Sequence, residues 1–163
     1  MARAHRYGRQ LALIVFDLDD FKAINDRIGH LSGGAVLAET AERVREAVRT
    51  ADIPCRVGGD EFAVVLPESS THDADQLYHR LRGAVSSRPV GQAGRLLVSA
   101  GIAELQPDDD PTSFFERADE ALYRAKELGK GQVVEAEAEV VPEADVEASG
   151  RPASPPRGKA GSP

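Results

Sequence analysis

The chain has 163 residues, a formal net charge of −7 and a sequence pI near 5.1. This length suits one domain with a full-sized core, followed by a tail. The acidic balance argues against nonspecific binding to nucleic acid or to anionic membranes, because both need basic patches. No apolar stretch reaches the ~20 residues that a membrane span needs. The single cysteine, Cys55, excludes an intramolecular disulfide and suits the reducing cytoplasm, and its apolar surroundings predict a buried side chain.

Apolar periodicity along residues 1–134 predicts alternating strands and helices. Strands are expected at 11–17, in a hairpin over 54–66, at 95–102 and at 132–134. Helices are expected at about 20–28, at 33–50, from Ser70 or Thr71 onward, and from Thr112 or Ser113 to Gly129. Residues 1–134 are therefore expected to form the folded domain.

The composition changes from about Glu135 onward. Residues 135–147 contain six acids and no bases, and the remainder is rich in Ala, Ser, Gly and Pro. Such a segment cannot bury enough apolar surface to offset its chain entropy. Residues 135–163 are therefore predicted to be a disordered tail.

The run Gly58-Gly59-Asp60-Glu61-Phe62 stands between two apolar strands. The glycines are expected to form the tight turn of the hairpin, and the two acids to project from the rim of a sheet. Adjacent carboxylates repel each other unless something cationic lies there, and hard divalent cations prefer carboxylate oxygens. A solvated turn explains the same pentapeptide as well, so both interpretations stay open at this point.

A second group of acids follows the apolar strand at 11–17. Asp17 comes directly after the last core residue, at a strand end where folds of this kind often keep ligands. Asp19 or Asp20 is expected to cap the following helix instead. If the hairpin lies beside this strand, then Asp17, Asp60 and Glu61 converge on a metal site of the type used in nucleotidyl transfer.

Several separated segments together resemble the diguanylate cyclase, or GGDEF, domain family over about residues 5–134. Besides the run at 58–62, they are Phe16 to Asp26 (FDLDDFKAIND), Gly29-His30 with Gly33, Val98 to Ala103 (VSAGIA) and Ala118 to Lys126 (ADEALYRAK). The resemblance implies an α+β fold similar to the palm of nucleotide cyclases and polymerases. Such a fold has a central, mostly antiparallel sheet of about five strands, flanked by helices.

The resemblance also implies an activity, a diguanylate cyclase that condenses two GTP molecules to cyclic di-GMP and two pyrophosphates. Two domains would meet as a homodimer, each half-site holding two Mg²⁺ or Mn²⁺ ions. Asp17, Asp60 and the carbonyl of Leu18 match the metal ligands. Asp60 also matches the position of the base, and Glu61 that of a supporting acid.

Further positions match substrate contacts of the family. Lys22, Lys126 and Lys130 match cations that grip the triphosphate, and each could instead be a solvated surface lysine. Gly58 and Gly59 would let backbone amides approach the phosphates. Asn25 matches an amide that reads guanine. His30 matches a substrate contact, although a loop histidine satisfied by backbone is an equal alternative.

Three departures from the family pattern bear on activity. Gly34 replaces an aspartate that accepts hydrogen bonds from guanine, so reduced activity or relaxed purine selectivity is expected. Lys130 and Gly131 stand where the family usually has arginine and asparagine, so triphosphate binding is expected to be weaker. A segment and a helix that normally precede the strand at 11–17 are absent, so the domain is expected to be truncated at its N-terminus.

Arg49 and Asp52, five residues before Gly58 in an Arg-x-x-Asp pattern, match the family's inhibitory site for cyclic di-GMP, and Arg80 matches a further arginine of it. A helix-end ion pair is the plainer explanation of the pattern. The leading hypothesis is a diguanylate cyclase with weakened activity and product inhibition. The alternative is a noncatalytic receptor that binds cyclic di-GMP through these three residues.

Overall fold

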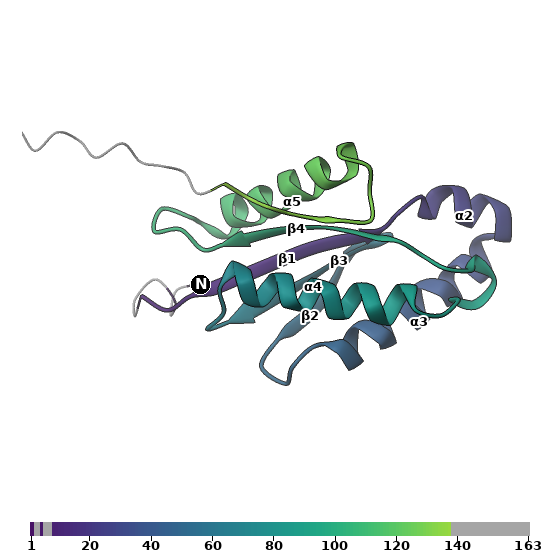
Figure 1. The fold of residues 1–163 in the computed structure, drawn as a ribbon, viewed down its shortest axis with the longest axis horizontal. Helices are drawn as coiled ribbons and strands as arrows, with labels where there is room; N and C mark the ends of the chain where they lie inside the picture. Colours follow the sequence, from purple (N-terminus) through teal and green to yellow (C-terminus); the bar gives the residue numbers. More distant parts are fainter. Residues whose placement is uncertain (2–3, 5–7, 138–163) are drawn as a thin grey trace, which may run out of the picture.

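The computed structural model describes residues 1, 4 and 8–137, which form one sheet with helices on both faces (Figure 1). The strands are β1 (Leu11–Leu18), β2 (Ile53–Gly58), β3 (Glu61–Pro67), β4 (Val98–Glu104) and β5 (Val133–Glu135). The helices are α2 (Phe21–Ile28), α3 (His30–Ala47), α4 (Thr71–Ser86) and α5 (Pro111–Glu127), with a 3₁₀ turn at Gly91–Ala93. No helix in these ranges has the length and apolar character needed to cross a membrane.

The sheet has the strand order β2-β3-β1-β4-β5, and only the β4–β5 pair is parallel. The eight residues of β1 lie in the middle of the sheet and are all buried. This is the mostly antiparallel, five-stranded α+β architecture that the sequence predicts, and that prediction is confirmed.

Alternation along β1 divides the core between the two faces of the sheet. Even-numbered residues such as Ile14 and Phe16 pack with α2, α3 and α4. Odd-numbered residues such as Leu13 and Val15 pack with residues of α5. Helix α5 lies on the other face of the sheet from α4 (Figure 1). Asp17 continues the odd series, so its carboxylate points to the α5 face at the end of the strand.

Most predicted boundaries agree with the structure to within one or two residues. Helix α3 spans His30–Ala47 rather than 33–50, and the starts of β4 and α5 also shift. Ser70 caps α4 in a reciprocal capping box with Asp73. Strand β4 begins at Val98 rather than 95, because residues 90–94 close a turn and the Ser86 hydroxyl binds the Leu96 carbonyl at 2.7 Å. Helix α5 begins at Pro111, because Asp110 and not Thr112 or Ser113 caps it.

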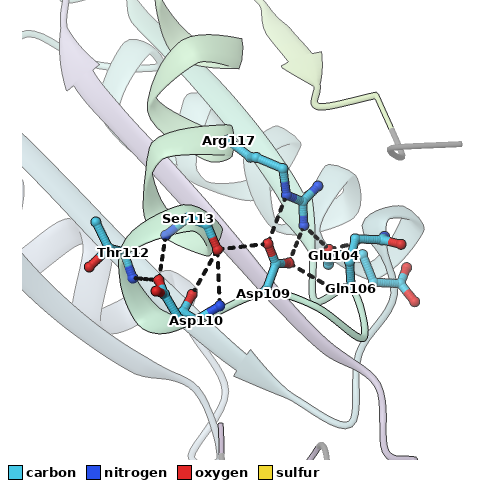
Figure 2. A network of polar contacts seen from close by, with 7 residues as sticks. All are labelled: Glu104, Gln106, Asp109, Asp110, Thr112, Ser113 and Arg117. Carbon is cyan, nitrogen blue, oxygen red and sulfur yellow. Dashed lines mark hydrogen bonds and ion pairs between the residues drawn. The ribbon is translucent and has the colours of Figure 1, made fainter. Parts of the chain in front are cut away.

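A polar network fixes the start of α5 to the end of β4 (Figure 2). The Asp110 carboxylate accepts the amides of Thr112 and Ser113 at 2.8 and 2.9 Å. The Arg117 guanidinium bonds the Asp109 carboxylate and the Glu104 carbonyl, each at 2.5 Å. Because α5 is anchored at this end, its last turn is delivered to the opposite end of the sheet, where β1 ends.

The prediction that Cys55 is buried is wrong. Cys55 lies on the edge strand β2 and is exposed. Helix α5 covers β1 and β4 on its face of the sheet, and an apolar groove remains beside it over the β2–β3 hairpin. Ile53 and Val57, the neighbours of Cys55 on that face, are 57% and 48% exposed. The apolar composition of β2 therefore does not reflect burial among the described residues.

Candidate functional site

The acids of the hairpin meet the end of β1 through the register of the sheet. In the antiparallel β1–β3 pair, Asp17 lies directly opposite Glu61. Such cross-strand partners have Cβ atoms about 5 Å apart on the same face. Asp60 precedes Glu61 at the tip of the hairpin. Burial raises the pKa of both Asp17 and Glu61, and the nearby charge of Asp60 adds to this effect. The structure thus brings the three predicted acids together.

Asp17 is the acid whose ionisation is most perturbed. Burial raises the pKa of its carboxyl to about 6, against the opposing effect of Lys126. Its Oδ2 forms an ion pair with the Lys126 ammonium at the last turn of α5. Its Oδ1 is buried and has no hydrogen-bond partner among the described residues. A buried carboxylate oxygen without a donor fits a position that a cation would occupy.

The other predicted ligands are consistent with a cation at this place, without forming a complete cage. The Leu18 side chain is 1% exposed and packs in the core, so only its backbone can serve the site. Burial and the charges of Asp119 and Asp60 raise the pKa of Glu61, while Lys126 opposes them. Among the described residues, no group of three His, Cys, Asp or Glu side chains is arranged to hold a metal. A divalent ion would therefore need ligands beyond the acidic side chains.

A side chain of the hairpin itself stabilises its tip. Arg56 Nε and Nη2 donate to the Gly59 carbonyl at 2.9 and 2.6 Å. A Cβ added at Gly58 or Gly59 would meet no atom within 4 Å, and neither residue has a φ in the left-handed region. No contact or backbone angle within the described chain therefore requires glycine at these two positions. The space beside their Cα atoms is open.

An open pocket lies between this tip and the α2–α3 corner. Its lining includes the predicted residues Lys22, Asn25, His30, Gly59 and Asp60. Asn25 Nδ2 and His30 Nδ1 lie 2.7 Å apart. A Cβ at Gly33 would overlap the Asn25 amide, so glycine is required there for Asn25 to lie against α3. Gly34 also lines the pocket, but it is exposed and has open space around it.

The three predicted lysines lie in different settings. Lys126 is half-buried on Asp17, and that carboxylate raises its pKa despite the opposing effect of burial. Lys130 Nζ lies 2.6 Å from Asp20 Oδ1. Lys22 is exposed at the start of α2, in the pocket. All three lysines thus lie near the end of the sheet where β1 finishes.

The prediction that Asp19 or Asp20 caps the helix after β1 is right about the position of Asp20 and wrong about its side chain. Asp20 occupies the N-cap of α2 with a left-handed backbone (φ 57°), and its side chain makes no capping hydrogen bond. Its carboxylate pairs with Lys130 instead. Asp19 is 7% exposed and binds Ser99 and Gly131 across the sheet end. Sequence reasoning missed Ser99, whose only signal was its place beside Gly101 in the VSAGIA segment.

The predicted product-site residues gather at the end of α3. The Asp52 carboxylate is buried and accepts the Arg49 backbone amide at 2.8 Å, which closes a turn. Arg80 of α4 donates from Nε to the Ala47 carbonyl at 3.3 Å. Arg49 and Arg80 are both exposed. The structure therefore assigns Asp52 a local structural contact, while the two guanidinium groups face solvent.

Comparison with known proteins identifies the family. The model of the diguanylate cyclase GGDEF domain family matches residues 1–132. Diguanylate cyclase DgcP of Pseudomonas aeruginosa is 43% identical over 136 residues, which cover 82% of this chain and 20% of that protein. Response regulator PleD of Caulobacter vibrioides is 39% identical over 138 residues, which cover 81% of this chain and 30% of that protein. The chain belongs to the GGDEF family and spans about a fifth to a third of these two relatives.

Solved structures agree with this assignment and with the fold. The GGDEF domain of DgcB from Caulobacter crescentus, in complex with c-di-GMP, has a TM-score of 0.79 and 34% identity, covering 84% of each chain. The active GGEEF domain of a diguanylate cyclase from Vibrio cholerae has a TM-score of 0.78 and 32% identity, covering 84% of this chain and 89% of that one. The predicted family and fold are both confirmed.

Proposed function

We propose that this domain is a diguanylate cyclase, which joins two GTP molecules into cyclic di-GMP with release of two pyrophosphates. The observation that carries the proposal is the meeting of Asp17, Asp60 and Glu61 at one end of the sheet, with an orphaned Asp17 oxygen among them. Membership of the GGDEF family supports it. Incubating purified protein with GTP and Mg²⁺, and measuring pyrophosphate and cyclic product, tests it directly.

In the proposed reaction, the 3′-hydroxyl of one GTP attacks the α-phosphate of the other, and pyrophosphate leaves. Asp17, Asp60 and the Leu18 carbonyl would hold two Mg²⁺ or Mn²⁺ ions, which supply charge neutralisation on the phosphates and a lower pKa for the attacking hydroxyl. Asp60 would accept the proton, with Glu61 beside it. A homodimer is needed, because each domain presents one nucleotide pocket to the other.

The remaining pocket residues would bind and orient the nucleotide. Gly58 and Gly59 leave room for a phosphate against their amides, because an added Cβ at either meets nothing. Lys22, Lys126 and Lys130 would neutralise the triphosphate, for which Lys126 must leave Asp17. Asn25 would read the guanine edge, and its contact with His30 fixes the plane of its amide.

A titration of Mn²⁺ against the nucleotide-free protein checks the role of Asp17. Its pKa of about 6 lies above the ordinary value, so its carboxylate takes up a proton as the pH falls through 6. Because a protonated carboxyl does not ligate metal, Mn²⁺ affinity should fall about tenfold per pH unit below 6. For the same reason, protonation of Asp17 adds to the free energy of unfolding at low pH. This contribution is lost as the pH rises through about 6.

Electron spin resonance of free Mn²⁺ measures this affinity at each pH. Asp17→Asn should bind Mn²⁺ weakly and should lose the change near pH 6. An equally steep fall in the Asp17→Asn protein would assign the titration to another group.

Gly34→Asp should sharpen the choice of purine. Gly34 lines the pocket and has open space around it, so an aspartate fits there without repacking. The new carboxylate can accept hydrogen bonds from the guanine N1–H and amine. Glycine leaves these donors unpaired, and an unpaired buried donor costs about 1–3 kcal/mol of binding free energy. The preference for GTP over ATP, measured by competition against a fluorescent nucleotide, should rise at least about tenfold.

Ala35→Asp is the matched control. Ala35 is exposed on the same helix, and the substitution adds the same charge one residue away. It should leave the preference unchanged. If the wild-type protein already prefers GTP as strongly as Gly34→Asp does, Gly34 is not a site of base recognition.

A product-binding site is the second part of the proposal, built on Arg49, Asp52 and Arg80. The two exposed guanidinium groups flank the end of α3, where either can grip a phosphate or a guanine edge. The noncatalytic receptor remains the alternative function. Two observations favour the receptor. Gly34 offers no acceptor for guanine, and Lys126 forms an ion pair with Asp17, a proposed metal ligand.

Arg49→Ala should weaken binding of labelled cyclic di-GMP about tenfold or more, because a charge-assisted hydrogen bond is lost. Equilibrium dialysis gives the dissociation constant. Arg45→Ala is the control, since Arg45 is exposed one turn earlier on α3 and pairs with Glu42. Equal affinity of Arg49→Ala and wild type would remove Arg49 from the site.

A further inference from the structure

Residues 129–131, which join α5 to β5, have an unusual backbone. Gly129, Lys130 and Gly131 follow one another with φ values of 119°, 65° and 60°. Lys130 has a side chain, and the left-handed conformation costs such a residue about 1 kcal/mol or more. Contacts from elsewhere must therefore hold this segment in place.

The Lys130 amide donates to the Ala125 carbonyl of α5 at 3.1 Å, which holds the first part of this segment. Two buried side chains hold the residue that follows. The Gly131 amide donates to Asp19 Oδ2 at 2.9 Å and to Ser99 Oγ at 3.0 Å. The Ser99 hydroxyl donates to Asp19 Oδ1 at 2.7 Å. Ser99 is fully buried, and Asp19 is 7% exposed. Both oxygens of Asp19 are thus used in a closed set of hydrogen bonds, which we call the latch.

The latch is itself fixed to the sheet. The Asp19 amide donates to the Leu97 carbonyl at 2.9 Å, and Ser99 belongs to β4 directly opposite Asp17. The hydrogen bonds to an ionised carboxylate are stronger than those between neutral groups. The latch therefore ties the loop after α5 to the end of β1, two residues beyond Asp17.

The latch helps to place Lys130. Gly131, the residue that the latch binds, comes directly after Lys130. The Lys130 ammonium in turn lies 2.6 Å from the carboxylate of Asp20, the neighbour of Asp19. The end of α5 holds the Lys130 amide, and the latch holds the next amide, that of Gly131, so the two together set the direction of the Lys130 side chain.

We propose that Asp19 and Ser99 are positioning residues, which hold Lys130 at the end of β1 where it can bind the nucleotide triphosphate. This role rests on the proposed function. In this proposal the Asp19 carboxylate serves as a hydrogen-bond acceptor, and the role of metal ligand stays with Asp17 and Asp60. The proposed route from the latch to the nucleotide runs through Lys130, and this route can be tested.

A double-mutant cycle tests the route through Lys130. The affinity for a nonhydrolysable GTP analogue is measured by calorimetry for wild type, Asp19→Ala, Lys130→Met and the double variant. Each single variant should bind about tenfold more weakly, as for one lost charge-assisted hydrogen bond. The double variant should bind as weakly as Lys130→Met alone. A further tenfold loss in the double variant, or no loss in Asp19→Ala, would overturn the proposal.

Amide exchange at Gly131 gives a readout that needs no nucleotide. Its N–H should be protected in wild type and exchange at least about a hundredfold faster in Asp19→Ala. Ser99→Ala is a milder variant in case Asp19→Ala does not fold, and it should show the same direction of change. Glu120→Gln, an exposed change on α5, should alter neither exchange nor affinity.

The two readouts separate the possible failures. An unprotected Gly131 amide in wild type would overturn the latch even if the analogue binds. Failure of wild type to bind the analogue would overturn the proposed function, and with it the role of the latch in nucleotide binding.

Discussion

Asp60→Ala should reduce the formation of cyclic di-GMP at least about a thousandfold, equivalent to about 4 kcal/mol of transition-state stabilisation. Asp60 stands at the tip of the hairpin and is only partly buried, so its loss removes no core packing. Its charge acts on both Asp17 and Glu61, the two neighbouring acids. The effect is therefore expected in the chemistry and not in the fold. Cyclic product from GTP and Mg²⁺, separated by chromatography, is the measurement.

The thermal midpoint of Asp60→Ala should stay close to that of wild type, which separates lost chemistry from lost structure. Glu120→Ala, which removes an exposed acid from α5, should leave product formation unchanged. If Asp60→Ala makes as much product as wild type, these acids are not the catalyst.

Gly101→Ala should destabilise the domain by about 3 kcal/mol or more. Gly101 of β4 lies opposite Val15 beneath α5. A Cβ there would overlap backbone atoms of Ala118 and Leu122. Because backbone atoms of a helix cannot turn aside as a side chain can, the whole of α5 must move away from the sheet. The thermal midpoint should fall by about 10 °C for a domain of this size.

Gly83→Ala is the matched control for this effect. Gly83 is exposed inside α4, and an added Cβ meets nothing within 4 Å. Alanine is the better helix former by about 1 kcal/mol, so this variant should be stabilised. A Gly101→Ala protein that melts with wild type would show that α5 does not lie as close to β4 as the structure has it.

The sequence was sufficient for the sheet and for the meeting of the acids. The apolar run ending at Asp17 and the hairpin around Asp60 are local patterns. Strand alternation then allows only a few ways for them to pair. Once β3 lies beside β1, the register places Asp17 opposite Glu61.

What the sequence did not reveal depends on contacts between distant residues. The Asp19–Ser99 hydrogen bond joins residues 80 positions apart, and nothing near Asp19 distinguishes it from a helix cap. The exposure of Cys55 depends on which strands α5 covers, and strand composition is the same in either case. The contact of Lys126 with Asp17 likewise requires α5 to be docked at a known angle.

The Lys126–Asp17 pair has a consequence for the order in which ligands bind. In the proposed function, the ammonium acts as an internal counter-ion before nucleotide binds, so a divalent ion would have to compete with a tethered cation. A bound triphosphate would offer that ammonium a second anion and draw it from the carboxylate. Each ligand therefore prepares the place of the other, and nucleotide and metal should bind with positive cooperativity.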